Sequence, residues 1–290
     1  MTQRRQEVLV EAGRLAAKGE PFALATVVSV KRPASARRGD RALVTADGAI
    51  VGWVGGACSE PIVVREALRA VSEGTPRLVR IGPEGTAAGP GEDDVVCADS
   101  HCASEGTVEV LVEPQLPGPL LAVVGDGPAA RTLAELARTV GWRVVSQPDA
   151  GAEAVVVATM GTRDEEALAA ALALSADYVA LVASSRRAGV VLDALRARGI
   201  SEEELARVRS PAGLDLGPCT QEEIAVAVLA ELVAWRHART PAAEPLAEAI
   251  DPVCGMTVSI TGAAATAEID GVTYYFCSQH CRHSFVEANR

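Results

Sequence analysis

The sequence predicts an α/β protein that combines an α+β N-terminal domain, a Rossmann-like parallel-sheet domain and a small cysteine-rich module. From Leu120 onward, strand and helix patterns alternate, which is typical of a parallel sheet covered on both faces. Residues 1–117 mix helix and hairpin signals without that alternation. Residues 251–290 hold three of the seven cysteines, in a segment too short to bury a large core.

Two segments separate these parts. Pro114–Pro119 contains three prolines, and residues 240–250 combine two prolines with several alanines. Both compositions are typical of connections between domains. We therefore expect domains at residues 1–117, 118–239 and 251–290, with residues 240–250 as a linker.

The composition narrows the classes of function. The 290-residue chain has a formal net charge of −11 and 3 % aromatic residues, so it lacks the basic surface and stacking side chains of a nucleic-acid binder. It has no run of about 18 apolar residues that would span a membrane. Residues 1–19 predict an amphipathic helix rather than an export signal, and the odd number of cysteines favours reduced thiols. We expect a soluble cytoplasmic protein.

The N-terminal domain continues after this helix with strands and one further helix. The Asp47-Gly48 pair predicts a hairpin turn, and the helix that follows should run to Glu73. The expected strands are residues 22–30, the two beside the hairpin turn, 78–81 and 107–113. Residues 82–106 are too long and polar for an ordinary connection, which predicts a functional or mobile loop.

That loop contains Cys97, His101 and Cys102. These side chains could form part of a metal site, but their spacing matches no strong zinc pattern. A loop without a metal is the alternative.

The segment from Gly52 to Val64 is the first candidate site. Gly55 and Gly56 permit a tight turn or a close approach of a ligand to the backbone. Ser59 is a suitable N-cap for the next helix, so Cys58 should stand just before a helix N-terminus, where backbone N–H groups favour anions and thiolates. The segment therefore predicts a site for an anionic or metal-containing ligand. A half-buried cysteine packed under the helix is the alternative.

Residues 32–40 form a loop with three arginines and a glycine. The guanidinium groups of Arg37 and Arg38 could hold phosphate, because their forked donors match phosphate oxygens. A solvated loop is the alternative.

The second domain opens with Leu120–Val124, a continuous apolar run typical of a buried parallel strand. Gly125, Gly127 and Ala130 follow in a G-x-G-x-x-A pattern that opens a helix, which is the context of a dinucleotide-binding turn. The second strand, 142–147, ends without the acidic residue that ordinary NAD binding requires. The turn therefore favours phosphate or a pterin nucleotide over NAD(P). A turn kept only for helix–strand packing is the alternative.

Later strand–helix units continue the alternation. The expected elements are strands 154–158 and 178–183, helices from residue 164, at 186–198 and at 220–237, and a loop at 209–217.

The tail, residues 251–290, predicts a hairpin at Asp270-Gly271 and a short helix. Cys254, Cys277 and Cys281 are its expected metal ligands, because so small a module usually needs a staple and thiolates favour Cu(I) or Zn(II). His280 should point to a different helix face from Cys277, so it ranks below the cysteines. Cysteines that only pack beneath the helix are the alternative.

Taken together, three motifs resemble the XdhC/CoxI accessory proteins of molybdenum hydroxylases such as xanthine dehydrogenase and aerobic carbon monoxide dehydrogenase. They are the Gly52–Glu60 segment, the Glu105–Pro114 run and the Arg209–Gly217 loop, and the resemblance spans about residues 5–237. The Arg32–Asp40 loop looks more like the carbon monoxide dehydrogenase branch. The resemblance implies the family's N-terminal domain followed by a Rossmann-like domain.

The resemblance also assigns residues. Cys58 matches the cysteine of the family's glycine motif, Gly125, Gly127 and Ala130 match its Rossmann turn, and Cys102 matches a cysteine before its Val-Glu-Val strand.

The tail resembles the YHS domain, which is also attached to copper-transporting ATPases. Cys254, Cys277 and Cys281 match the cysteines of that domain. The tail is a departure from the usual two-domain accessory protein.

These resemblances imply a cytoplasmic maturation factor rather than a turnover enzyme. It would bind the molybdenum cofactor, as a pterin or pterin dinucleotide, support its sulfuration or completion, and pass it to an apo molybdenum hydroxylase. Phosphates would lie on the Arg37–Gly39 loop and a helix N-terminus, and Cys58 would face the molybdenum or carry a sulfur taken from a donor. We expect a homo-oligomer, and copper in the tail is implied by a client whose site contains molybdenum and copper.

Two other classes of function remain. An NAD(P)-dependent oxidoreductase would act through Gly125–Ala130, although no proton-transfer group is evident beside the turn. A metal-sensing adaptor would act through the tail.

Overall fold

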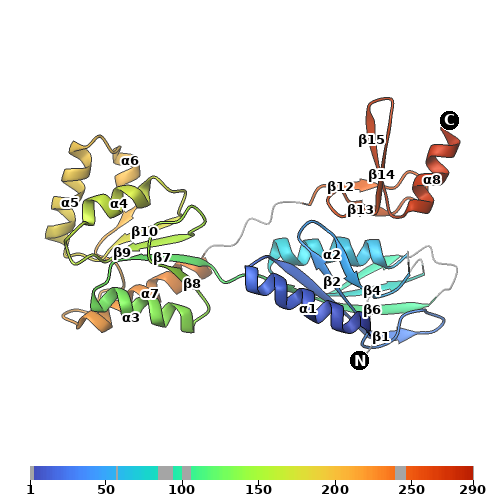
Figure 1. The fold of residues 1–290 in the computed structure, drawn as a ribbon, viewed down its shortest axis with the longest axis horizontal. Helices are drawn as coiled ribbons and strands as arrows, with labels where there is room; N and C mark the ends of the chain where they lie inside the picture. Colours follow the sequence, from blue (N-terminus) through green and yellow to red (C-terminus); the bar gives the residue numbers. More distant parts are fainter. Residues whose placement is uncertain (1–2, 57, 84–93, 100–105, 239–245, 290) are drawn as a thin grey trace. The chain divides into compact units, whose positions relative to one another are not determined.

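The computed structural model describes residues 3–56, 58–83, 94–99, 106–238 and 246–289. The chain divides into two compact units (Figure 1). One joins Met1–Pro117 with Pro241–Arg290, and the other is Gly118–Thr240. The N-terminal domain and the tail thus form one unit.

The N-terminal domain is built on a mixed sheet. Its strands are β1 (Phe22–Lys31), β2 (Arg41–Thr45), β3 (Ile50–Gly52), β4 (Arg77–Gly82), β5 (Val95–Asp99) and β6 (Thr107–Gln115). Within the described residues their order is β3-β2-β1-β6-β4-β5, and neighbours are antiparallel except for the parallel pair β4–β5. The strands expected from the sequence are confirmed. β5 was not predicted, because residues 82–106 were expected to form a loop. The short Val95-Val96 run in that segment pairs with β4 at the edge of the sheet.

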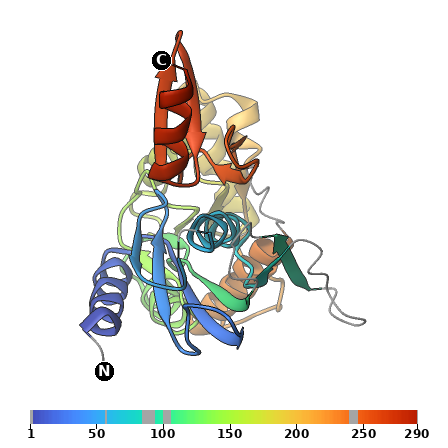
Figure 2. The same ribbon diagram turned by 90° about the vertical axis from the view of Figure 1, so that its right-hand side faces the viewer.

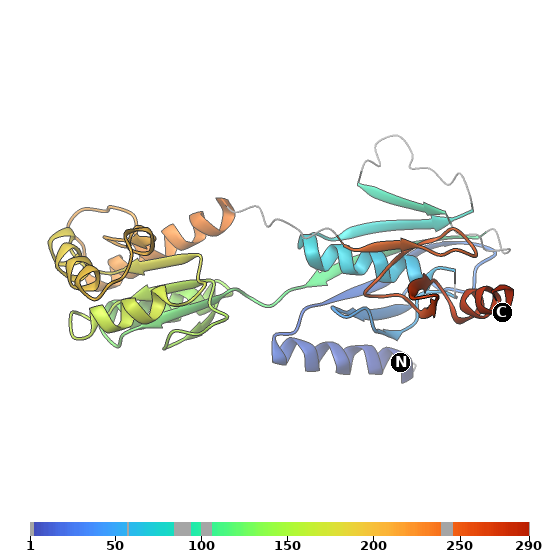
Figure 3. The ribbon, with the colours of Figure 1, turned by 90° about the horizontal axis from the view of Figure 1, so that it is seen from above.

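Two helices cover opposite faces of this sheet (Figure 3). α1 (Gln3–Lys18) packs Val8 and Leu15 against Phe22 and Leu43. α2 (Glu60–Glu73) packs on the alternate residues of the same strands, such as Ala23. Side chains alternate across a strand, so a single strand supplies both layers.

The tail consists of two ribbons and a helix. Its elements are β12 (Glu248–Ile250), β13 (Thr257–Ser259), β14 (Ala265–Ile269), β15 (Val272–Phe276) and α8 (Gln279–Ala288). As predicted, β14 and β15 form a hairpin that turns at Asp270 and Gly271, both with positive φ, which is the conformation of a two-residue hairpin loop. α8 lies along the hairpin and places Phe285 against Tyr274 and Phe276 (Figure 2).

The tail packs on α2, and the two share one hydrophobic core. Met256, Val258 and Phe276 join Val64 and Leu68 in that cluster. α2 is consequently buried on more than one side; its buried residues are Pro61, Ile62, Val63, Val64, Glu66, Ala67, Leu68 and Ala70.

Glycines make the contact between the tail and the N-terminal domain close. A Cβ added at Gly262 would lie 2.5 Å from Cγ1 of Val64. A Cβ added at Gly48, in the β2–β3 turn, would lie 2.5 Å from Cα of Gly262. Side chains at these positions would hold the tail away from its support.

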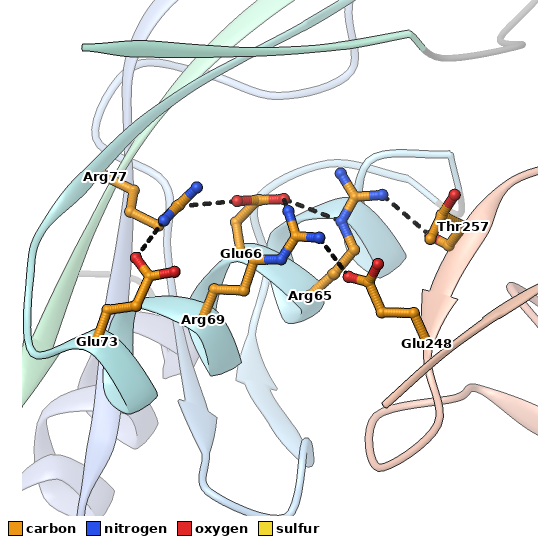
Figure 4. Close-up of polar contacts among 7 residues, drawn as sticks. All are labelled: Arg65, Glu66, Arg69, Glu73, Arg77, Glu248 and Thr257. Carbon is orange, nitrogen blue, oxygen red and sulfur yellow. Dashed lines mark hydrogen bonds and ion pairs between the residues drawn. The ribbon is translucent and has the colours of Figure 1, made fainter. Parts of the chain in front are cut away.

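Glu66 organises the polar part of the contact (Figure 4). Its side chain is fully buried, and its carboxylate accepts hydrogen bonds from Arg65 Nε at 2.9 Å, Arg69 Nη1 at 3.1 Å and Arg77 Nε at 2.9 Å. Two of these arginines also reach the tail: Arg69 Nη2 lies 2.5 Å from Glu248, and Arg65 Nη1 donates to the Thr257 carbonyl at 3.2 Å. One buried carboxylate therefore fixes the arginines that hold the tail in place.

The second unit is the expected parallel sheet with helices on both faces. Its strands are β7 (Leu120–Val124), β8 (Arg143–Val145), β9 (Ala154–Val157), β10 (Tyr178–Leu181) and β11 (Val208–Arg209). Its helices are α3 (Pro128–Thr139), α4 (Asp164–Leu172), α5 (Ser185–Ala197), α6 (Glu202–Leu205) and α7 (Gln221–Ala238). The order is β11-β10-β9-β7-β8, with α3 and α7 on one face and α4, α5 and α6 on the other (Figure 1).

The sequence did not predict β11 or α6, which are too short to give a periodic pattern. In the sheet, the strand order reverses between β7 and β9, the place where doubly wound sheets bind ligands. No helix in the described part of the chain is long and apolar enough to cross a membrane.

Candidate functional sites

The three cysteines of the tail come together. Cys254 follows β12, Cys277 follows β15, and Cys281 lies in the first turn of α8. The Sγ atoms of Cys254 and Cys277 are 3.6 Å apart, as are those of Cys277 and Cys281. A disulfide would require about 2 Å, whereas thiolates about 2.3 Å from one tetrahedral metal ion lie about 3.8 Å from each other. The spacing of this thiol cluster fits a shared metal ion.

Asp251 completes the surroundings of the thiol cluster, and sequence reasoning missed it. Its carboxylate accepts hydrogen bonds from the backbone N–H groups of Cys277 at 2.8 Å, Val253 at 2.9 Å and Cys254 at 3.4 Å. Its ligand oxygen and the three Sγ atoms all lie within 4.8 Å of one another. The bond to the N–H two residues on is an Asx turn, so the Asp-Pro-Val-Cys sequence held a signal for it.

Burial controls protonation in this cluster. It raises the pKa of the Cys277 thiol and the pKa of the Cys254 thiol, because an ionised sulfur would lose its solvation. Burial would also raise the pKa of Asp251, but the N–H groups of Cys277, Val253 and Cys254 offset it and hold that pKa below its ordinary value. The Asp251 carboxylate is therefore charged, and the thiols of Cys254 and Cys277 are neutral in the metal-free chain.

Ser278 supports the third thiol. It is the N-cap of α8, and its Oγ accepts a hydrogen bond from the Cys281 N–H at 3.2 Å. His280 and His283 are exposed on the same helix, outside the thiol cluster. His280 was expected to be a weaker candidate ligand than the cysteines, and it lies outside their cluster.

The Cys58 turn depends on Gly55. This glycine has a φ of +149°, and an added Cβ would lie 3.0 Å from Cβ and Oγ of Ser59. Gly56 has open space around it and needs no special conformation, so only one of the two predicted glycines is required. The Ser59 N–H donates to the Gly56 carbonyl at 2.9 Å and closes the turn, which leaves Cys58 half-buried before α2.

Ser59 occupies the predicted N-cap position, but its side chain makes no capping hydrogen bond to the described start of α2. The reason is its backbone, whose helical φ and ψ of −91° and −34° differ from the extended conformation of a capping serine. Pro61 lies in the first turn, as predicted. Next to it, Glu60 is partly buried, and this burial raises the pKa of its carboxyl.

Arg37 and Arg38 are exposed. Their loop is held by the Asp40 carboxylate, which accepts from the Arg37 N–H at 2.7 Å. His101 and Cys102 lie outside the described residues, and Cys97 is exposed on β5. A joint site of Cys97, His101 and Cys102 therefore stays a prediction.

The Rossmann turn has the expected glycines. Gly125 has a φ of +140°, and an added Cβ would lie 2.1 Å from the Ala158 carbonyl oxygen. Gly127 is the N-cap of α3, and an added Cβ there would lie 2.6 Å from Sδ of Met160. Ala130 is buried in the core between α3 and the sheet, so its role is packing.

A cavity of about 880 Å³ opens beside this turn, at the carboxyl ends of β7, β9 and β10. Gly127, Met160, Arg187 and Cys219 are among its lining residues. The guanidinium of Arg187 is fixed, because its Nε donates to the buried Asp164 carboxylate at 2.7 Å and its Nη2 donates to a backbone carbonyl.

No sequence pattern indicated the Arg187–Asp164 pair, since the two residues meet only through the order of the strands. A fixed guanidinium is suited to phosphate or carboxylate. The cavity thus combines a glycine turn, a helix N-terminus and an oriented cation, which is a site for an anionic nucleotide-like ligand.

Three protein families match this chain. The XdhC and CoxI family matches residues 15–82, the XdhC Rossmann domain matches residues 121–232, and the YHS domain matches residues 249–289.

Individual proteins are also similar. An uncharacterized protein of Escherichia coli strain K12, YqeB, is 30 % identical over 256 residues, which cover 78 % of this chain and 46 % of YqeB. The chain thus spans about half the length of this relative. A solved structure described as a xanthine dehydrogenase from Bacillus halodurans is 18 % identical with a TM-score of 0.39, and the match covers 82 % of this chain and 98 % of that one. From the family matches, the chain combines the two domains of the XdhC and CoxI family with a YHS domain.

Proposed function

We propose that this protein is an accessory factor for the maturation of a molybdenum hydroxylase of the xanthine dehydrogenase or carbon monoxide dehydrogenase type. The observation that carries the proposal is the pair of matches to the XdhC and CoxI family and the XdhC Rossmann domain, in that order along the chain. The protein binds the molybdenum cofactor and supplies it to the apo-enzyme after sulfuration or completion. An apo-hydroxylase and a sulfur donor are its partners, it acts in the cytoplasm, and it assembles as a homo-oligomer.

The two domains contribute different groups to this function. Cys58 supplies a half-buried thiol ahead of α2, which ligates the cofactor's metal or carries its sulfur. In the Rossmann-like unit, Gly127 and Arg187 line a cavity large enough for a nucleotide and receive its phosphates. Arg37 and Arg38 remain exposed and available to a phosphate.

The test compares the wild-type chain with Cys58→Ser in cells that make the cofactor and a client hydroxylase. The wild type should co-purify with pterin, detected by fluorescence after oxidation, and should restore client activity. Cys58→Ser should lower both while the circular dichroism spectrum stays unchanged. Cys97→Ser, which removes an exposed thiol of β5, is the matched control. Equal pterin content and client activity in Cys58→Ser would sink this assignment.

The cavity of the second unit needs a separate test, because the alternative ligand is NAD(P). Calorimetric titration with a pterin dinucleotide, NAD and NADP separates the maturation factor from an oxidoreductase. Arg187→Gln should weaken binding of the correct ligand at least tenfold, the loss expected for a charged hydrogen bond. Arg186→Gln removes a neighbouring exposed charge and should change little. Gly127→Val should also abolish binding, and equal binding by this variant would make the turn purely structural.

A second function is carried by a different observation, the three sulfur atoms of the thiol cluster. We propose that they bind a thiophilic metal ion, with Cu(I) preferred over Zn(II). Structural zinc sites take four ligands, whereas the oxygens of Asp251 here are already used by three N–H groups. Three sulfurs without a nitrogen ligand suit Cu(I).

The metal test uses the full-length chain, because the tail shares its core with α2. Cu(I) and Zn(II) are titrated against competing chelators. Cys277→Ser should weaken binding by more than about 100-fold, since even the loss of a group that only orients a ligand costs 10- to 100-fold. The control is Cys219→Ser, which removes an exposed thiol of the second unit. A wild-type chain that binds neither metal at micromolar strength would make the cluster a packing element, and tighter zinc than copper binding would reverse the preference.

A further inference from the structure

A cleft of about 430 Å³ separates the start of α2 from the tail. One wall is the turn between β2 and β3 together with Glu60, Pro61 and Val64. The other wall is the tail, with the loop that follows β13 and the pair Cys277-Ser278. One member of the thiol cluster therefore lines a cavity whose opposite wall belongs to the N-terminal domain.

The charges of the cleft all have one sign. Among its lining residues, which all lie in the described part of the chain, the charged ones are Asp47 and Glu60, and both are acidic. Asp47 is exposed at the hairpin turn, where Thr45 donates a hydrogen bond to its carboxylate. Glu60 is partly buried at the first position of α2. Clefts lined by one sign of charge concentrate the counter-ion and accelerate its arrival.

The cleft is a fixed feature of the first unit. The Glu66 network holds the tail on one side of it through Glu248 and Thr257. The close approach of Gly48 to Gly262 joins the walls beside it. Cys277 and Glu60 thus lie on facing walls that are joined by contacts outside the thiol cluster.

We propose that this cleft is the route by which a metal cation reaches the thiol cluster, and that Glu60 binds the incoming ion before it passes to Cys277. The inference rests on the metal centre proposed above and adds a residue from the other domain to it. A carboxylate is a weaker ligand for a thiophilic ion than a thiolate, so the ion is held briefly and then passes inward.

The transfer is a ligand exchange without a change of oxidation state. The metal–oxygen bond to Glu60 breaks as the metal–sulfur bond to Cys277 forms. The thiol proton moves to the carboxylate that the ion has vacated, so that with Cu(I) both the metal–thiolate pair and the carboxyl group are neutral.

The experiment is a stopped-flow measurement of metal transfer to the reduced full-length apo-protein. Cu(I) is offered as its bicinchoninate complex and Zn(II) as a chromophoric chelate, and loss of the chelate absorbance reports uptake. Glu60→Gln should slow uptake about tenfold, the lower end of the effect of charge steering, while the equilibrium affinity stays within twofold of wild type. Glu60→Asp should recover part of the rate.

Two further variants make the test decisive. Glu7→Gln removes the same charge from an exposed position of α1, on the other face of the sheet, and should leave the rate unchanged. Ala263→Leu narrows the cleft without altering its charge and should slow the uptake of both Cu(I) and Zn(II). If wild type, Glu60→Gln and Ala263→Leu take up metal at equal rates and with unchanged affinity, the proposed route is wrong, whereas the proposed metal centre is not affected. Failure of the wild-type chain to bind either metal would overturn both.

Discussion

The two thiol sites of the first unit are built in different ways. In the tail, the buried carboxylate of Asp251 accepts from the N–H groups of Cys254 and Cys277, and Ser278 accepts from that of Cys281. The other site is a single thiol, Cys58, on a turn before α2.

The difference lies in what fixes each thiol. The tail cysteines converge before any ligand arrives, and two of them are buried in a core shared with α2. Cys58 is half-buried, and the described part of its turn depends on the backbone conformation of Gly55. Preorganised ligands give affinity on their own. The tail is thus expected to bind its ion unaided, whereas Cys58 needs a ligand held elsewhere in the protein or in a partner.

The largest expected effect comes from removing the support of the tail. Glu66→Gln leaves three arginines facing a neutral amide in a buried site, and breaking a buried pair costs about 3–5 kcal/mol. Urea unfolding followed by circular dichroism should show this loss in the free energy of unfolding of the first unit. Metal affinity of the tail should fall with it, because the tail is no longer fixed on α2.

Glu73→Gln is the matched control for Glu66→Gln. It removes the ion pair between Arg77 and Glu73, whose side chain is 39 % exposed. Exposed ion pairs contribute about 0–1 kcal/mol to the free energy of unfolding. Equal losses in the two variants would mean that Glu66 does not organise the contact, and the two thiol sites would then differ less than proposed.

The second prediction sharpens the contrast at the tail. Asp251→Asn replaces a carboxylate that accepts three N–H bonds with a group that has one acceptor oxygen. Metal affinity should fall about 10- to 100-fold, as for other groups that orient metal ligands. The metal–thiolate charge-transfer absorption should keep its position, since the sulfur ligands are unchanged. A shifted absorption band would instead identify Asp251 as a ligand.

The third prediction concerns the Cys58 turn. Gly55→Ala should lower the stability of the first unit by about 1–3 kcal/mol, the cost of a strained backbone conformation. Gly56→Ala introduces the same methyl group into open space and should change stability little. Differential scanning calorimetry of the two variants measures the difference. If Gly55→Ala and Gly56→Ala change the stability equally, the turn does not depend on the positive φ of Gly55.

Much of this fold could be predicted from the sequence because its signals are local. The alternation after Leu120, the Asp47-Gly48 turn and the Asp270-Gly271 hairpin each depend on a few neighbouring residues. β5 was missed because Val95-Val96 is short and becomes a strand only beside β4.

The candidate sites were predictable only in part. The three tail cysteines were predicted as ligands because thiols in a small module point to a metal; their Sγ atoms converge, and metal binding stays a prediction. The contact between the tail and α2 was not predicted. Its signal was α2 itself, which is apolar on several sides and carries a buried Glu66, a pattern that requires a second layer.

The Arg187–Asp164 pair in the second unit could not be predicted. The two residues are 23 positions apart, and they meet only because β9 and β10 are neighbours in the sheet. Local patterns carry no information on such pairs.

The smallest expected effect is a pH-dependent change in melting temperature caused by Glu60, the partly buried carboxylate in one wall of the cleft. Burial raises the pKa of Glu60, so its folded pKa lies above the unfolded value. The stability contributed by this group is complete below the unfolded pKa, near 4.3, and is lost as the pH rises through the folded pKa. At pH 7 the charged carboxylate therefore destabilises the first unit, and Glu60→Gln should raise its melting temperature slightly. At pH 4 the variant and the wild type should melt together, because both side chains are then largely neutral. Thermal melts at the two pH values, with Glu7→Gln as the exposed control, measure the difference. A wild-type chain that is more stable than Glu60→Gln at pH 7 would show that Glu60 makes a favourable contact in its charged form. Its charge would then serve the stability of the fold.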